Sequence, residues 1–229
     1  MSKALYTYAG LRSWSEDEIE LREAFQARAV AVVRRTLTGI NPAWQFMRTE
    51  GPCLAPESAI NPAYTPDDVF VTNHARGGER FLPQPRNNRQ RYRAAHASGR
   101  KLPLCVWQAR KSFRRETNDG ATAEKLRFNE FWQLEFQCIY RADTKADYRT
   151  PLINAVGLEV SRFTRLDTRV INSDRLPSYS ESTLDIEVMH GGSWREVASC
   201  SIRTDYAPDV RVCEIAVGLC RVAAIAGRA

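Results

Sequence analysis

The stretch that decides the fold is Phe113-Arg114-Arg115-Glu116, followed after a polar loop by Arg127-Phe128-Asn129-Glu130-Phe131-Trp132-Gln133-Leu134-Glu135. Side chains two apart along a β-strand share one face of the sheet. We therefore expect Arg127, Phe131 and Glu135 to point the same way, beside Arg114 and Glu116 on the partner strand. One face of this predicted hairpin then carries two guanidinium groups, an aromatic ring and two carboxylates.

This set of side chains favours a nucleotide site. Guanidinium groups bind phosphate oxygens through paired hydrogen bonds, and an aromatic ring can stack on a flat base. Neighbouring carboxylates can hold an ammonium group or a metal. For a single Arg/Glu pair, a solvated ion pair with Phe131 in the core would be the simpler interpretation. Because the whole spaced set occurs together, the sequence predicts a face that binds ATP beside an amino acid.

The flanking sequence predicts an α+β fold of long antiparallel hairpins with helices at both ends. Ser15 and Glu18 match a capping box, which begins a helix that ends near Leu37. Residues 73–102 lack clear apolar periodicity and are expected to form a loop. The remaining predicted elements are strands at 102–107, 128–140, 183–189, 194–202 and 212–217 and a helix at 219–226.

Composition sets the size of the core and points to a charged partner. The chain has 229 residues, of which 43% are hydrophobic, enough for one sizeable core. The formal net charge of +6 fits a polyanionic partner. Twelve of the 33 Lys and Arg residues lie between Arg76 and Arg115, where Glu79 is the single acid. The Arg-rich loop 76–101 fits contact with nucleic acid or, equally, a solvated loop.

Residue spacing disfavours several other classes of protein. The six cysteines include no CxxC pair and the three histidines have no metal-type spacing, so zinc and hydrolase functions are disfavoured. No apolar run approaches the roughly 20 residues that a membrane span needs, and the N-terminus has no apolar signal segment. We therefore expect a cytoplasmic protein that makes no membrane contact.

The same residues carry a resemblance to a known family. The pattern FRxE, a loop and then RxxxFxxx(D/E) resembles motif 2 of the class II aminoacyl-tRNA synthetases. Residues 194–197 and 203–206 are similar to a strand of the glycyl type, 214–221 resemble motif 3, and 15–52 would be motif 1. The resemblance implies a single catalytic domain over residues 1–229, in which helices flank an antiparallel β-sheet. It also implies a homodimer formed through motif 1.

The resemblance implies an ATP-binding role for four matching residues. Arg114 would hold the α-phosphate and Arg127 the γ-phosphate end. Phe131 would stack under the adenine, with Arg221 on the other side of the base. Arg114 and Arg221, together with Glu116, would be the catalytic residues, and Glu116 would hydrogen-bond near the base or the acceptor end.

Three further acids receive roles from the same resemblance. Glu135 and Glu196 match acids that meet the amino group of glycine in the glycyl branch. Glu214 would help to hold Mg²⁺. ATP, Mg²⁺ and a small amino acid are thus the expected ligands.

Four departures from the family pattern bear on activity. Residues 82–92 read LPQPRNNRQRY where the family has RPE(T/A)…G, and Arg110 stands in place of a glycine. Ala216 replaces a serine near the amino-acid pocket, and Cys220 stands where an acid is common. The chain ends eight residues after Arg221, so we expect no anticodon-binding domain.

Two functions fit these observations. The first is an enzyme that activates a small amino acid, glycine favoured, and passes it to a tRNA end, a carrier protein or a small molecule. The second is a non-catalytic paralogue that binds nucleic acid through 76–101 or acts as an accessory subunit. Retention of the motif residues favours the enzyme, because a pure binding module has no need for all of them.

Overall fold

A mixed seven-stranded β-sheet forms the centre of the protein. The computed structural model describes residues 6–8, 11–60, 64–72, 81–84, 98–116, 122, 124–174 and 176–227. The strand order is β3-β6-β7-β11-β10-β9-β8. The strands are β3 (Gln45–Arg48), β6 (Leu104–Phe113), β7 (Glu130–Arg141), β8 (Thr168–Asn172), β9 (Ser180–His190), β10 (Ser193–Arg203) and β11 (Val210–Gly218). The sheet was expected to be antiparallel throughout, but β3 runs parallel to β6 at one edge.

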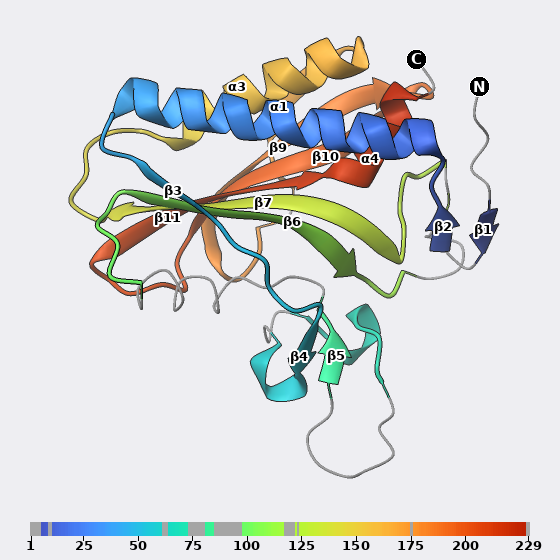
Figure 1. Ribbon diagram of the computed structural model, residues 1–229, viewed down its shortest axis with the longest axis horizontal. Helices are drawn as coiled ribbons and strands as arrows, with labels where there is room; N and C mark the ends of the chain where they lie inside the picture. Colours follow the sequence, from blue (N-terminus) through green and yellow to red (C-terminus); the bar gives the residue numbers. More distant parts are fainter. Residues whose placement is uncertain are drawn as a thin grey trace.

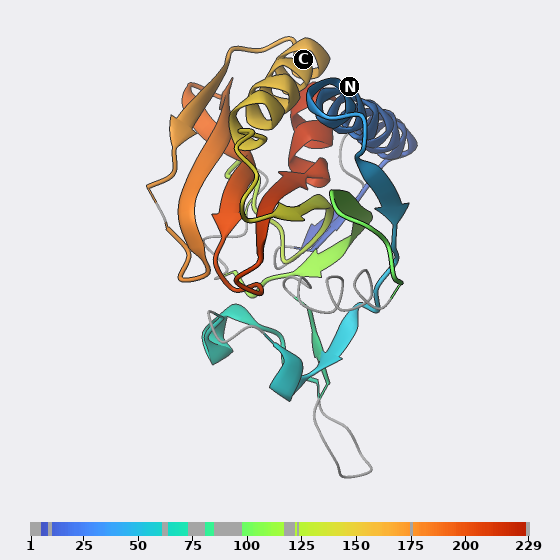
Figure 2. The ribbon, with the colours of Figure 1, turned by 90° about the vertical axis from the view of Figure 1, so that its left-hand side faces the viewer.

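Three helices cover one face of this sheet: α1 (Glu16–Ile40), α3 (Arg149–Thr164) and α4 (Leu219–Ala226). Figures 1 and 2 show them stacked on the same side. The main core lies between these helices and the sheet. Its fully buried members include Phe25, Val33, Leu37, Leu134, Phe136, Leu152, Val156, Ile186, Ile215 and Val222. Burial of this apolar surface is what holds the layers together.

The opposite face of the sheet is polar over its central strands. Register places Asp185 beside Ser199, Ser199 beside Ala216, Ala216 beside Glu135 and Glu135 beside Gln108, in one row across five strands. Adjacent strands lie about 4.8 Å apart, so the two carboxylates of this row flank a floor of small side chains. This is the face on which the sequence predicts the ligand site.

A small two-stranded arm lies against this polar face, on the side away from the helices (Figure 1). Strand β4 (Leu54–Pro56) pairs with β5 (Phe81–Pro83), and two short 3₁₀ helices follow β4 at Glu57–Ala59 and Pro66–Asp68. A second small sheet joins β1 (Tyr6–Tyr8) to β2 (Leu11–Ser13) near the start of α1. Among the described residues, no helix has the length and apolar character to cross a membrane.

Several elements agree with the sequence predictions and others do not. The first helix, the β9–β10 hairpin, the strand near 212–217 and the C-terminal helix are confirmed, with longer strands than expected. A loop was expected over residues 73–102, but the short strand β5 forms within this range because it pairs with β4. No prediction covered α3 or β8. Pro151 and Gly157 have low helix propensity, so the sequence carries only a weak signal for α3. The helix nevertheless forms, because Pro151 lies in its first turn, where a backbone N–H would have no partner within the helix.

The capping box of α1 is confirmed and gives a direct test of the fold. The Glu18 amide donates to Ser15 Oγ at 3.3 Å, and the Ser15 amide donates to Glu18 Oε2 at 3.1 Å. We expect Ser15→Ala to lower the free energy of unfolding by about 1 kcal/mol, as measured by urea denaturation. Thr38→Ala removes a hydroxyl near the other end of the same helix, and this variant should change the free energy of unfolding by less than ~0.5 kcal/mol. Equal effects of the two variants would contradict a specific cap.

Candidate active site

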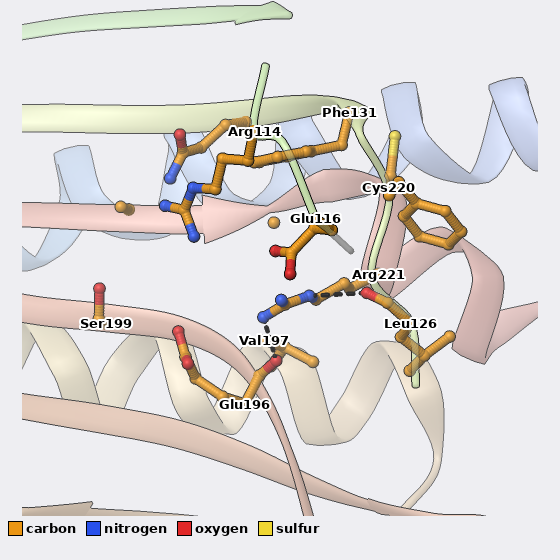
Figure 3. Close-up of a pocket in the computed structure, with 13 residues that line it drawn as sticks. Arg114, Glu116, Leu126, Phe131, Glu196, Val197, Ser199, Cys220 and Arg221 are labelled. Atoms are coloured by element: carbon orange, nitrogen blue, oxygen red, sulfur yellow. Dashed lines mark hydrogen bonds between the residues drawn. The ribbon is translucent and has the colours of Figure 1, made fainter. Parts of the chain in front are cut away.

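Three of the residues predicted from the hairpin line a cavity on the polar face of the sheet. Arg114, Glu116, Phe131, Glu196 and Arg221 all line this cavity. They come from the end of β6, from β7, from β10 and from α4. Figure 3 shows Phe131 on one side and Arg221 on the other, with the Glu116 carboxylate between them. The predicted roles of Phe131 and Arg221 in stacking on a base stay predictions.

Hydrogen bonds hold Arg221 in place. Its Nε donates to the Leu126 carbonyl at 2.9 Å and its Nη1 donates to the Glu196 carbonyl at 2.8 Å. Burial lowers the pKa of Arg221, Glu196 opposes this shift, and Arg114 adds to it. Leu126 has a positive φ of 53°, so the turn that presents its carbonyl is strained for a branched residue. Sequence reasoning did not identify Leu126, because the interaction is with its backbone.

Arg114 and Glu116 are positioned by Asn129 at the start of the returning strand. The Arg114 amide donates to the Asn129 carbonyl at 3.0 Å, and the Glu116 amide donates to Asn129 Oδ1 at 2.8 Å. The Arg114 guanidinium carbon lies 5.5 Å from the centroid of the Phe131 ring. Asn129 was not predicted as a site residue, although its place between the motif positions Arg127 and Phe131 is the signal that could have identified it.

The residue spacing predicted that Arg127 lies on the same strand as Phe131 and Glu135, but the structure places it before that strand. Strand β7 begins at Glu130, and Arg127 belongs to the turn before it. The geometry still brings Arg127 to the site, because its Nη1 lies 3.5 Å from Glu116 Oε2. Arg127 lines a larger groove that also includes Arg114, Glu116, Glu196 and Arg221.

The two acids predicted to meet an amino group lie differently in the site. Glu196 lines both the cavity and the larger groove. Glu135 is only 2% exposed and lies on the same face between Gln108 and Ala216, outside the residues that line the cavity. Its predicted role stays a prediction.

Glu214 has partners other than those predicted for it. Its Oε2 accepts a hydrogen bond from Arg203 Nη1 at 2.8 Å and another from the Gln137 amide. Glu214 is 1% exposed and does not line the cavity. Within the described residues, no group of three or more His, Cys, Asp or Glu side chains is arranged to hold a metal. The predicted Mg²⁺ role of Glu214 therefore does not fit these contacts, since Arg203 already neutralises the carboxylate.

Two of the sequence departures lie in the cavity wall. Ala216 and Cys220 both line it. The Cys220 sulfur accepts the Trp132 backbone N–H at 3.1 Å, and burial raises the pKa of the thiol to about 11. Cys220 is therefore a neutral side chain that packs near the start of β7. The Arg-rich loop 76–101 falls mostly outside the described residues, so its predicted contact with nucleic acid stays a prediction.

An acid that the sequence did not single out lies in the larger groove. Asp185 on β9 is 8% exposed, and its immediate neighbours in the groove include Glu187 and Glu196. Burial raises the pKa of Asp185 to about 6, and Glu196, Asp174 and Glu187 add to this shift, whereas a hydrogen bond from Ser173 opposes it. The register with Ser199 and Ala216, which only the folded sheet reveals, brings Asp185 to the site.

The fold is similar to that of solved aminoacyl-tRNA synthetases. Giardia lamblia prolyl-tRNA synthetase, solved in complex with prolyl-adenylate, matches 97% of this chain with a TM-score of 0.73 and 14% sequence identity. Prolyl-tRNA synthetase from Cryptosporidium parvum, complexed with halofuginone and AMPPNP, matches 96% with a TM-score of 0.76 and 12% identity. This chain covers 48% of each of those chains. It therefore has the catalytic-core fold of a class II aminoacyl-tRNA synthetase, as the sequence predicted.

In sequence the chain is similar to glycine–tRNA ligases. It is 31% identical over 118 residues to the Clostridium tetani ligase and 30% identical over 114 residues to that of Lachnospira eligens. These alignments cover 49% and 48% of this chain, and 25% and 24% of the two ligases. The chain thus spans about a quarter of the length of the curated relatives it matches. No family model matches the chain.

The raised pKa of Asp185 predicts a dependence of stability on pH. The carboxyl has an ordinary pKa of 3.8 and a folded-state pKa of about 6, so the native state binds the proton more tightly than the unfolded state. The native state therefore loses stability as the pH rises from about 4 through about 6. We expect Asp185→Asn to be stabilised relative to the original protein at pH 8 and not at pH 4. After allowance for solvent screening, the difference is on the order of 1 kcal/mol.

Urea denaturation at the two pH values measures this difference. Asp143→Asn serves as the matched control, because Asp143 is exposed and its ion pair is with Arg141, two residues away. The control should change little at either pH. A gain for Asp185→Asn that is the same at pH 4 and pH 8 would contradict the assigned ionisation.

Proposed function

We propose that this chain uses ATP to activate a small amino acid, with glycine favoured, as an aminoacyl-adenylate. One observation carries the proposal: Arg114, Glu116, Phe131, Glu196 and Arg221, which lie up to 107 positions apart in the sequence, line one cavity. Side chains that formed only separate surface ion pairs would not be expected to line a common cavity.

The adenine of ATP would occupy the gap between Phe131 and Arg221. The Phe131 ring supplies a flat apolar surface, and the tethered Arg221 guanidinium supplies a planar cation on the other side of the base. The phosphates would then extend into the larger groove, where Arg114 and Arg127 both lie. A groove with several guanidinium groups suits a triphosphate because each can bind two oxygens at once.

The amino acid would lie over the small floor formed by Ser199 and Ala216. Glu196 lines the groove beside this floor and can accept hydrogen bonds from an ammonium group. Glu135 lies on the other side of Ala216 in the same row. The similarity to glycine–tRNA ligases supports glycine as the substrate.

The reaction would be an in-line displacement at the α-phosphorus of ATP. A carboxylate oxygen of the amino acid forms the new P–O bond, the bond to the bridging oxygen of the β-phosphate breaks, and pyrophosphate leaves. Arg114 would stabilise the negative charge on the α-phosphate oxygens, and Arg127 the charge on the departing phosphates. Mg²⁺ bound with ATP would supply further neutralisation of the phosphates. The protein contributes position and charge, with no nucleophile of its own.

The acyl group would then pass to a tRNA end or to another acceptor. We also propose that the protein acts in the cytoplasm as a homodimer that forms through α1, as the resemblance of motif 1 implies. Size measurement in solution tests the dimer independently of activity.

Amino-acid-dependent exchange between ATP and labelled pyrophosphate tests the activation step. We expect exchange with glycine, or with another small amino acid such as alanine or serine, when all twenty are compared. Arg114→Ala should lower the rate roughly 10²- to 10³-fold, because it removes a charged donor from the reacting phosphate.

Arg141→Ala is the matched control for this loss of charge. Arg141 is exposed at the end of β7 and pairs with Asp143, so the variant should retain the original rate. If none of the twenty amino acids supports exchange, the proposal is wrong, and a non-catalytic binding role takes its place.

The Phe131 ring is tested separately from the phosphate contacts. Phe131→Ala removes the stacking surface, which is worth ~1–3 kcal/mol per base, so KM for ATP should rise about 5- to 150-fold. KM for the amino acid should change much less. Phe131→Tyr keeps the ring and should retain a KM for ATP near the original value; a large rise in this variant would argue against stacking.

A further inference from the structure

Two of the sequence departures contact each other in the folded protein. Arg110 stands in place of a glycine, and Gln84 lies in the divergent segment, directly after Pro83 where the family pattern has the acid of RPE. Arg110 Nη2 donates to Gln84 Oε1 at 3.3 Å across 26 positions of sequence. Arg110 is 4% exposed and Gln84 is 2% exposed. A buried guanidinium requires partners of this kind, because an uncompensated charge is costly to bury.

The Gln84 side chain uses both ends of its amide. While Oε1 accepts from Arg110, Nε2 donates to the carbonyls of Pro52 at 3.2 Å and Leu54 at 3.1 Å. Arg110 Nη1 also donates to the Pro52 carbonyl, at 2.5 Å. A carboxylate at position 84 could accept from Arg110 but could not donate to the two carbonyls. With an arginine at position 110, the glutamine amide at position 84 therefore makes more hydrogen bonds than a carboxylate there could make.

These bonds fix the arm, defined as residues 49–60, 64–72 and 81–84, against strand β6. The Gly51 amide adds a bond to Gln108 Oε1 at 3.3 Å. The arm in turn bonds to both neighbours of Arg114. The Phe113 amide donates to the Gln84 carbonyl at 3.2 Å, and the Arg115 amide donates to the Asp68 carbonyl at 3.0 Å. The backbone that carries the Arg114 guanidinium is therefore held from the arm side by two hydrogen bonds.

We propose that Arg110 and Gln84 form a positioning pair that sets the place of Arg114 through the arm. The pair contacts no part of the cavity itself, since neither residue lines it. Among the described residues, no arm residue lines the cavity between Phe131 and Arg221, whereas Tyr64 and Asp68 of the arm line the larger groove. The pair therefore acts on the backbone that carries Arg114 and makes no contact with Phe131 or Arg221. Its catalytic consequence rests on the proposed function.

The test compares Arg110→Met, Gln84→Met and the double variant. Each single variant should lower kcat of pyrophosphate exchange about tenfold or more, because a small displacement of a catalytic group has effects of this size. KM for ATP should stay within about twofold of the original value, because the adenine contacts are intact. The double variant should be no worse than the more affected single variant, since both break one network.

Hydrogen exchange at the Phe113 and Arg115 amides gives a readout that does not need activity. Both amides should exchange faster in all three variants. Lys111→Met is the matched control, because Lys111 lies on the same strand with an exposed side chain that pairs with Glu130; it should leave both amides and kcat unchanged. If the original protein shows no pyrophosphate exchange, the proposed function is wrong. The amide exchange rates alone then test whether Arg110 and Gln84 hold the backbone on either side of Arg114.

Conservative variants separate this pair from a general loss of structure. Arg110→Lys retains a cation and should restore part of kcat, which also covers the case in which Arg110→Met does not fold. Gln84→Glu keeps the acceptor but loses both donors, so it should behave like Gln84→Met. Unchanged amide exchange in Arg110→Met, an unchanged kcat in an active protein, or a Gln84→Glu variant equal to the original would each overturn the proposal.

Discussion

The antiparallel pairing of β6 with β7 is the interaction on which the rest of the site depends. It sets Ser112 opposite Phe131 and Gln108 opposite Glu135, and it brings the Arg114 amide to the Asn129 carbonyl. Because neither strand lies at an edge of the sheet, their helix-facing side chains are buried in the main core. The same backbone hydrogen bonds therefore join the stability of the fold to the geometry of the polar face.

The polar face concentrates charge that the fold must compensate. Arg203 is held between Asp205 and Glu214, and Arg110 is held by Gln84 and the Pro52 carbonyl. By contrast, the groove around Asp185 gathers several carboxylates, and burial with their mutual repulsion raises the Asp185 pKa. A cationic group at this place would relieve that repulsion, which agrees with the proposal that an amino-acid ammonium binds beside Glu196.

Local pattern was sufficient for much of the fold and part of the site. The capping box, the β9–β10 hairpin and the C-terminal helix follow from short-range periodicity, and the structure has all three. Arg114, Glu116 and Phe131 line one cavity, although β6 ends at Phe113 and the first two lie beyond it. Strand spacing was wrong for Arg127, because β7 begins only at Glu130. Helix α3 escaped prediction because Pro151 and Gly157 weaken its apolar pattern.

Local sequence pattern therefore indicated which side chains of the hairpin could share a face, since neighbours two apart on a strand point the same way. The tertiary structure was needed to show which distant residues meet them. In the folded protein Arg110 hydrogen-bonds to Gln84, and Glu214 forms an ion pair with Arg203. Asp185 lies in one row with Ser199 and Ala216. Such contacts depend on strand order and on how the arm folds back, and residues tens of positions apart carry no local signal of either.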